Sequence, residues 1–300
     1  MKYTKQYSSP AELVELLKRR GLDFSDVDNA EAAIWSIGYY RLSGYLYPLL
    51  AAPKSEHRYK KGSTFGNALS LYEFDRELRL LVLNQIERIE IAVRSAVANI
   101  ICEETGDIFW MTNRKHFVNT EKFDRTISLI DKELQSTHED FIIHFKHTYE
   151  ESYPPSWMLT EILPLGTLTR VYENIADNKI RKRIAKSFGL TVPVFMSWMT
   201  VITLTRNSCC HHARLWNRYL SLRTLVMTRP LRPWISDGVR QGRIFFTLCI
   251  LKHFVDIVWE GNSFKQDLMD LLGRYPMVDI HAMGFPSTDW TREPLWYSQQ

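Results

Sequence analysis

The stretch that decides the fold is residues 65–103, FGNALSLYEFDRELRLLVLNQIERIEIAVRSAVANIICE. Apolar residues recur in it every three or four positions, which is the period of one face of an α-helix. They are Leu71, Leu78, Val82, Ile86, Ile89, Val93, Ala96 and Ile100. The spacing predicts one long helix with a single buried stripe.

A second long helix is predicted over residues 191–219, with Pro193 in its first turn. Shorter helical patterns occupy residues 9–20, 28–40, 121–149, 156–162, 166–175, 179–188 and 244–272. No run shows convincing strand alternation beyond a few residues. The sequence therefore predicts an all-α bundle in which the two long helices pack antiparallel, with additional N- and C-terminal helices.

One segment boundary is predicted at Arg229-Pro230-Leu231-Arg232-Pro233, because two prolines so close together break a helix. We expect a helical domain over residues 1–225, with its core at about 65–225. Residues 226–300 are expected to form a helical and aromatic segment packed on that body.

Composition sets outer limits on the function. Of 300 residues, 45% are hydrophobic and 24% charged, which argues against wholesale disorder. The net charge of +4 permits nucleic-acid binding without requiring it. No apolar leader or membrane-length run is present, and no CxxC pair occurs among the cysteines, so a cytoplasmic, reducing location with no membrane association is expected. The cysteines are Cys102, Cys209, Cys210 and Cys249.

Residues 205–218, TRNSCCHHARLWNR, crowd polar groups into the predicted second long helix. At about 100° per residue, one stripe of that helix carries a mixed set of amide, imidazole and guanidinium groups. Its members are Asn207, His211, Arg214 and Arg218, with Arg206 on one flank. His212 falls on the apolar side, where we expect it to pack.

This polar set suits the cleavage of an RNA phosphodiester. His211 would transfer a proton, and Arg206 and Arg214 would bind the phosphoryl oxygens through their guanidinium forks. Asn207, one turn before His211, would orient its ring. A zinc site in this segment is rejected, since four consecutive helical residues point in all directions around the helix.

Asp75 is an anomaly, because it lies in the middle of the apolar stripe of the first long helix. Arg79 and Glu90 lie on the margin of that stripe, and Arg94 follows Glu90 by one turn. A buried salt-bridge network that fixes helix register is the favoured interpretation. The alternative, which is compatible with it, is that Glu90 or Arg94 orients the second long helix.

A basic helix, residues 179–188, is a further candidate for phosphate binding. A solvated surface remains the more favoured interpretation of its charges. The residues concerned are Lys179, Arg181, Lys182, Arg183 and Lys186.

Several blocks of the chain together resemble one protein family. They are IGYYRLSGY at 37–45, FDRELR at 74–79, IEIAVR at 89–94, RNSCCHHARLWNR at 206–218, and MGFP at 283–286 with Trp290. In this order they resemble the Abi-like family, the AbiD/AbiF type abortive-infection proteins, a branch of the HEPN superfamily. Cys210 stands where a small residue such as Ala is common.

The resemblance implies a HEPN-type helical bundle and a metal-independent endoribonuclease used in phage defence. Arg206 and His211 would be catalytic at a composite cleft between two protomers, so a homodimer is expected, with no cofactor and no metal. Asn207, Arg214, His212, Glu90 and Arg94 would support them, and Arg218 would join the basic helix in binding RNA. Some members have a noncoding RNA partner. The competing hypothesis is a non-catalytic protein that binds such an RNA.

Overall fold

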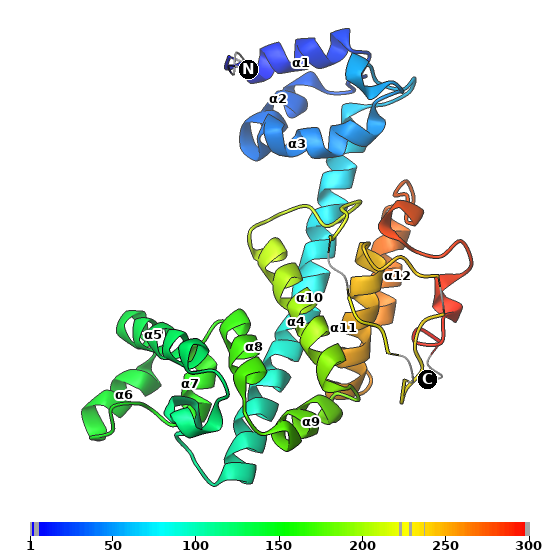
Figure 1. Ribbon diagram of the computed structural model, residues 1–300. Coiled ribbons are helices and arrows are strands. Elements are labelled where there is room, and N and C mark those ends of the chain that lie inside the picture. Colours follow the sequence, from blue (N-terminus) through cyan, green and yellow to red (C-terminus); the bar gives the residue numbers. More distant parts are fainter. Residues whose placement is uncertain (1, 3–5, 222–223, 228–229, 237, 298–300) are drawn as a thin grey trace. The chain divides into compact units, whose positions relative to one another are not determined.

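The computed structural model describes residues 2, 6–221, 224–227, 230–236 and 238–297 (Figure 1). Within these residues the secondary structure consists of helices α1 to α12 with short 3₁₀ turns, and strands are absent. The prediction of an all-α protein is therefore confirmed. Arg229, part of the predicted boundary, lies outside the described residues.

The chain divides into two compact units, and each is described by itself. The N-terminal unit comprises residues 1–80, 214–216 and 269–278. The main unit comprises residues 81–213, 217–268 and 279–300. The first predicted long helix is α4 (Phe65–Thr105), whose residues are shared between the two units.

The N-terminal unit is built from α1 (Pro10–Arg19), α2 (Val27–Ile37), α3 (Tyr39–Leu46) and the first turns of α4. Ser9 and Glu12 form a capping box that satisfies backbone N–H groups at the start of α1. Gly38, at φ 90°, separates α2 from α3. The helix predicted over residues 28–40 therefore ends at Ile37, because the chain turns at Gly38 through a backbone conformation that only glycine adopts easily.

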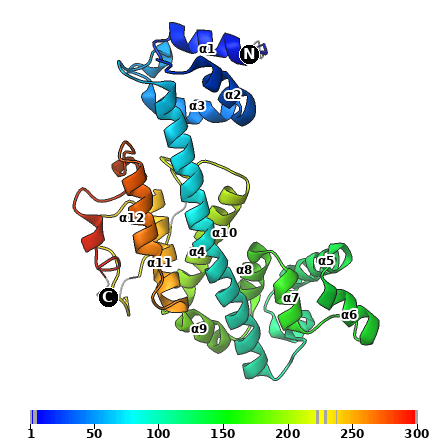
Figure 2. The same cartoon turned by 180° about the vertical axis from the view of Figure 1, so that it is seen from behind.

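The main unit contains the remaining helices (Figure 2). They are α5 (Thr120–Ser136), α6 (Asp140–Thr148), α7 (Ser156–Ile162), α8 (Leu165–Asn174), α9 (Asn178–Ser187), α10 (Val192–Cys210), α11 (Ile244–Val258) and α12 (Phe264–Arg274), whose last turns belong to the N-terminal unit. α10 packs against α8, α9 and α11, and in Figure 1 it runs opposite to α4. The helix predicted over 121–149 is divided between α5 and α6.

The C-terminal helices and tail pack into the main unit through aromatic side chains. Phe254 of α11 packs against Phe195 and Trp198 of α10. The tail folds back on α11, where the ring centroids of Phe245 and Phe285 lie 4.3 Å apart. The helix predicted over 244–272 is two helices, because the chain leaves helical geometry between Val258 and Phe264.

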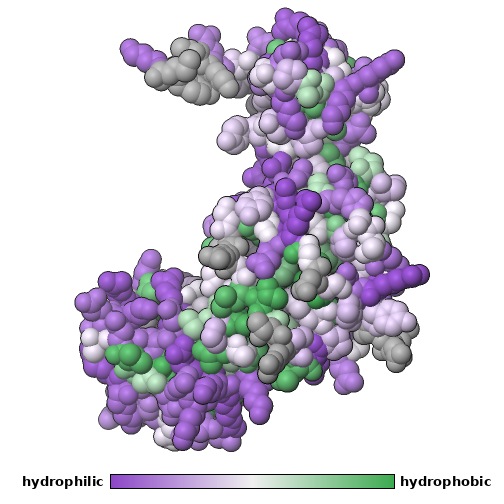
Figure 3. All heavy atoms as spheres, turned by 45° about the vertical axis from the view of Figure 1, so that its right-hand side comes forward, coloured by the Kyte–Doolittle hydropathy of each residue, from purple (hydrophilic) through white to green (hydrophobic). Residues whose placement is uncertain are grey.

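The face of the molecule shown in Figure 3 is largely hydrophilic. Figure 3 shows hydrophilic side chains over most of the face in view, with apolar side chains gathered in a patch over the main unit. Within the described part of the chain, no single helix has the length and apolarity to cross a membrane. The pair α9 and α10 meets these criteria only when taken together, and it is bent by 62°.

Candidate functional site

The polar motif lies at the C-terminal end of α10, where the helix stops at Cys210. His212 has a left-handed backbone with φ 54°. Its N–H donates to Cys209 O at 2.9 Å, and the N–H of Ala213 donates to Ser208 O at 2.8 Å. These two bonds form a Schellman motif, the common way in which a helix terminates. The prediction that this helix continues to Tyr219 is therefore wrong.

A carboxylate distant in sequence holds the chain beyond this turn. Asp75 Oδ1 accepts the backbone N–H groups of Leu215 at 3.0 Å and Trp216 at 2.6 Å. In a continued helix the same two amides would bond to the carbonyls of residues 211 and 212. The helix therefore ends where Asp75 offers these amides an alternative, charge-assisted partner.

Asp75 is fully buried, and its second oxygen is also satisfied. Tyr45 donates its hydroxyl to Oδ2 at 2.7 Å, and Arg79 forms an ion pair with the same atom. Burial and the Asp75 carboxylate raise the pKa of Tyr45, so this hydroxyl stays protonated and remains a donor. The predicted buried salt bridge is confirmed, and Asp75 also holds the part of the motif that follows α10.

The early end of α10 changes the predicted polar stripe. Arg214 donates to Gly44 O within the N-terminal unit, whereas Arg218 donates to Ser208 Oγ at 3.4 Å in the main unit. His212 is exposed rather than packed inward. The stripe and the inward position of His212 were both predicted from a continuous helix, and both are wrong because the left-handed turn at His212 redirects the chain.

Glu90 of α4 forms an ion pair with Arg206. Its Nε lies 3.8 Å from Glu90 Oε2, with 40% of the Arg206 side chain exposed and 14% of the Glu90 side chain. Glu90 also pairs with Arg94, which donates to the carbonyl of Thr160 in α7. Glu90 thus connects the nearly buried Arg94 to the half-exposed Arg206. The structure places Glu90 against α10, the arrangement that the sequence offered as an alternative.

His211 is the C-cap residue of α10, and its side chain is exposed, as is that of Asn207. The bond that joins these two residues runs between their backbones, from His211 N–H to Asn207 O at 3.0 Å. Among the described residues, no contact joins Arg206 to His211. Arg206 lies about one turn before the end of α10 and His211 caps it, and each presents polar atoms to solvent.

The cysteines and histidines of the motif do not converge. Cys209 is buried, and Cys210 is exposed. Within the part of the chain that the structure describes, no three His, Cys, Asp or Glu side chains are grouped so that they could hold a metal ion.

The basic helix is α9, and its charges divide into two kinds. Arg183 pairs with Glu103 at 2.6 Å and also with Glu104. Arg181 donates to Met196 Sδ at 3.2 Å and lies over the ring of Tyr172. Its lysines, by contrast, point to solvent; they are Lys179, Lys182 and Lys186. Two of the five predicted phosphate contacts are therefore already engaged within the protein.

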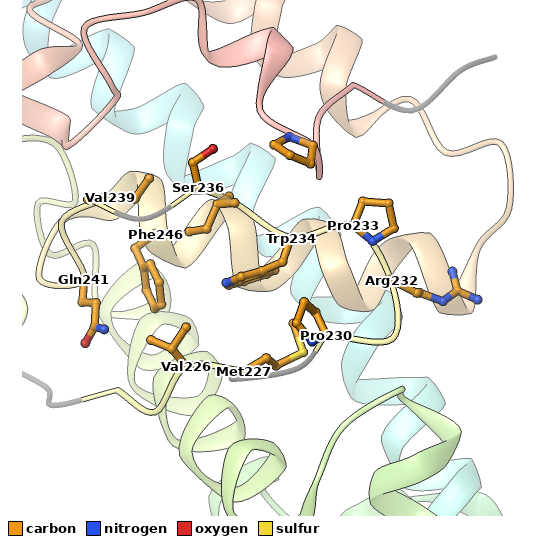
Figure 4. A pocket seen from close by; sticks show the side chains of 13 residues that line it. Val226, Met227, Pro230, Arg232, Pro233, Trp234, Ser236, Val239, Gln241 and Phe246 are labelled. Carbon is orange, nitrogen blue, oxygen red and sulfur yellow. The ribbon is translucent and has the colours of Figure 1, made fainter.

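A cavity of about 420 Å³ lies elsewhere in the main unit. Figure 4 shows Trp234 among its lining residues, together with Phe246, Pro230 and Gln241. The Nε1 atom of Trp234 is buried and has no hydrogen-bond partner among the described residues. None of the motif residues lines this cavity, and nothing in the sequence pattern pointed to it.

The partners of the motif were harder to find from sequence than the motif itself. Gly44, Thr160 and Ser208 contribute through backbone carbonyls or a hydroxyl, which carry no compositional signal. A signal did exist for Asp75, since a lone acid in an apolar stripe requires buried donors.

One protein-family model, described as Abi-like protein, matches residues 32–217. The matched region contains α4, α10, Asp75 and the motif as far as Asn217. No curated protein and no solved structure matches the chain.

Proposed function

Because the chain belongs to the Abi-like protein family, we propose that it is a metal-independent endoribonuclease that acts in abortive infection. Membership in this family supports the role in abortive infection. The proposal of RNA cleavage rests on one observation: Glu90 holds Arg206 at the solvent-facing end of α10, close in sequence to the exposed His211.

The proposed reaction is attack of a ribose 2′-oxygen on the adjacent phosphorus. The bond from phosphorus to the 2′-oxygen forms, and the bond to the 5′-oxygen of the next nucleotide breaks. The 2′-hydroxyl loses a proton and the leaving oxygen gains one, so the products are a 2′,3′-cyclic phosphate and a 5′-hydroxyl. His211 would carry one of these proton transfers, and Arg206 would donate to the phosphoryl oxygens as their charge rises.

We propose that the active form is a homodimer. A single imidazole cannot act as the base and the acid at once, so His211 of a second protomer would supply the other proton transfer. A composite cleft is also what the resemblance to HEPN proteins of the AbiD/AbiF type implies. A noncoding RNA that restrains the enzyme is part of the same proposal.

The supporting residues have distinct proposed roles. Glu90 orients Arg206, and Arg94 keeps Glu90 in place through its bond to α7. Asn207 and Arg218 lie near the helix end, where they would contact the RNA. The α9 lysines would bind phosphates further along the strand.

The test is incubation of the purified protein with RNA in the presence of a chelator. Arg206→Ala and His211→Ala should each abolish most cleavage, whereas the control His147→Ala, an exposed histidine of α6, should not. The new 3′ ends should be cyclic phosphates that resist phosphatase until they are opened by acid. Cleavage that requires a metal, or that survives both substitutions, would overturn the mechanism.

The competing proposal, a protein that binds RNA without cutting it, makes a different prediction. The wild type would then show no cleavage, and its RNA affinity would fall on substitution of arginines with a marked dependence on salt.

A further inference from the structure

The block IGYYRLSGY places two tyrosines on the surface of the N-terminal unit. Tyr40 on α3 is 94% exposed, and Tyr47, directly after that helix, is 55% exposed. The two tyrosines are seven positions apart, so they lie about two helical turns apart on the same face. Single exposed aromatic rings are common on protein surfaces, whereas two neighbouring ones on one helix face form a patch of the kind found at binding sites.

The residues between the two rings on this face are small. Ser43 and Gly44 are the residues that share this face with Tyr40 and Tyr47. A methyl group at Gly44 would lie 3.4 Å from Arg214 Nη1, so the absence of a side chain lets the guanidinium lie close against the helix. Arg214 is fixed there by its bond to Gly44 O.

Positive charge lies beside the same face. Lys54 Nζ lies 4.0 Å from the centre of the Tyr47 ring. The loop that carries Lys54 is folded back by an isolated bridge between Leu50 and Tyr59, and it also contains the exposed Arg58, Lys60 and Lys61 with Glu56 as its one acidic residue. Lys60 donates to Pro48 O, which ties this basic loop to the residues next to Tyr47.

We propose that Tyr40, Tyr47, Lys54 and Arg214 form a platform on which bases of single-stranded RNA stack. Exposed aromatic rings bind any base through its π face, and flanking cations bind the phosphates between the bases. The choice of RNA as the ligand rests on the proposed function. The four residues all belong to the N-terminal unit, so the platform is complete within that unit.

The chemistry of this surface favours a nucleic acid over a protein. The centre of a protein interface is depleted of lysine, whereas here a lysine lies against one of the two rings. The residues between the rings are small rather than aliphatic, so little apolar area would be buried against a protein partner.

The platform can be tested by binding alone. The probe is a fluorescent, single-stranded 2′-O-methyl oligoribonucleotide of about twelve residues, which cannot be cleaved because it has no free 2′-hydroxyl. The double variant Tyr40→Ala/Tyr47→Ala should bind the probe at least about 10-fold more weakly in fluorescence anisotropy. Tyr40→Phe/Tyr47→Phe should stay within about 2-fold of wild type, because the rings remain.

The matched control is Tyr297→Ala, which removes another exposed tyrosine, 61% accessible, from the main unit and should leave the affinity unchanged. Unchanged affinity of the double alanine variant would overturn the platform, as would equal losses in the phenylalanine and alanine variants. A change in oligomeric mass without a change in affinity would assign the face to a second copy and overturn it too.

The platform and the proposed ribonuclease fail in different ways. A wild type that binds the probe through these tyrosines but cuts no RNA keeps the platform and rejects the enzyme. A wild type that cuts RNA while the double alanine variant binds the probe normally keeps the enzyme and rejects the platform.

Discussion

Asp75 Oδ1 accepts the backbone N–H of Trp216 at 2.6 Å, across 141 positions of the chain. The bond is formed inside the core, since Asp75 is fully buried and Trp216 is 3% exposed. It joins the first long helix to the part of the motif that follows the end of α10. This single carboxylate therefore stabilises the fold and fixes where the motif segment leaves α10.

The first prediction concerns this carboxylate. Asp75→Asn should lower the free energy of unfolding by about 3 kcal/mol, because it leaves the buried Arg79 without its counterion and places an amide group among donors. Denaturant titration measures the loss. Glu73→Gln is the control, since Glu73 is an exposed acid on the same helix that pairs with Arg76 at 3.8 Å, and it should cost less than about 1 kcal/mol. Equal losses in the two variants would contradict the role of Asp75.

The second prediction concerns the turn that ends α10. His212→Gly should raise the free energy of unfolding by about 1 kcal/mol, because glycine adopts φ 54° without the steric cost that a side chain incurs. His211→Gly is the control, as residue 211 has φ −88° and should gain nothing from glycine. Both can be measured by denaturant titration, and a loss of stability in His212→Gly would contradict this prediction.

The third prediction concerns Glu90 and rests on the proposed ribonuclease. Glu90→Gln should lower kcat for RNA cleavage roughly 10-fold with little change in KM, because Arg206 loses the charge that orients it. Glu87→Gln, an exposed position on the same helix, should leave kcat unchanged. If Glu90→Gln unfolds the protein, Glu90→Asp can replace it, because this variant keeps the charge and shortens the side chain. It should likewise lower kcat with little change in KM. Full activity in a folded variant of Glu90 would reject the positioning role.

The fourth prediction concerns pH. Burial lowers the pKa of His253 below its ordinary value of 6.5, even though His253 Nε2 lies 2.9 Å from Phe188 O. In the part of the chain that the structure describes, its buried Nδ1 has no hydrogen-bond partner, so protonation would add an N–H that no described group accepts. Below pH 6.5 the unfolded chain binds a proton that the folded chain does not, and stability should therefore fall as the pH drops.

His253 should change the free energy of unfolding by at most about 1.4 kcal/mol per pH unit. This dependence is present only below the pKa that His253 has in the unfolded chain. Free energies of unfolding measured between mildly alkaline and mildly acidic pH should show it. His253→Gln should remove that part of the slope, whereas His147→Gln, at an exposed position, should keep it. Identical slopes in the wild type and His253→Gln would contradict the prediction.

Much of the fold follows from local sequence pattern. The stripe in residues 65–103 predicted α4 because a helical period of apolar residues has only one arrangement that buries them together. Ser9 with Glu12 marked the start of α1 through capping bonds made within a few residues, and Pro193 marked the start of α10 because its fixed φ suits the first turn of a helix. The motif residues could also be named, since their chemistry is a property of residue type and spacing.

The positions of the motif residues depended on contacts that the local pattern does not contain. Sequence periodicity predicted that the second long helix continues to Tyr219, because no residue between Cys210 and Tyr219 is a local helix breaker. Asp75 ends it earlier by taking the amides of Leu215 and Trp216. Arg214 and Arg218, predicted as neighbours, are consequently bound to different partners, Gly44 and Ser208.

The sequence by itself thus determined the all-α architecture, the first long helix and the residues of the motif. Only the tertiary structure decided where α10 ends, which carboxylate holds Arg206, and that two tyrosines of the N-terminal unit remain uncovered. The physical reason is the separation along the chain over which each kind of interaction acts. Helical periodicity and capping act over a few residues, whereas a buried carboxylate selects its donors by proximity in space, from any part of the chain that folding brings to it.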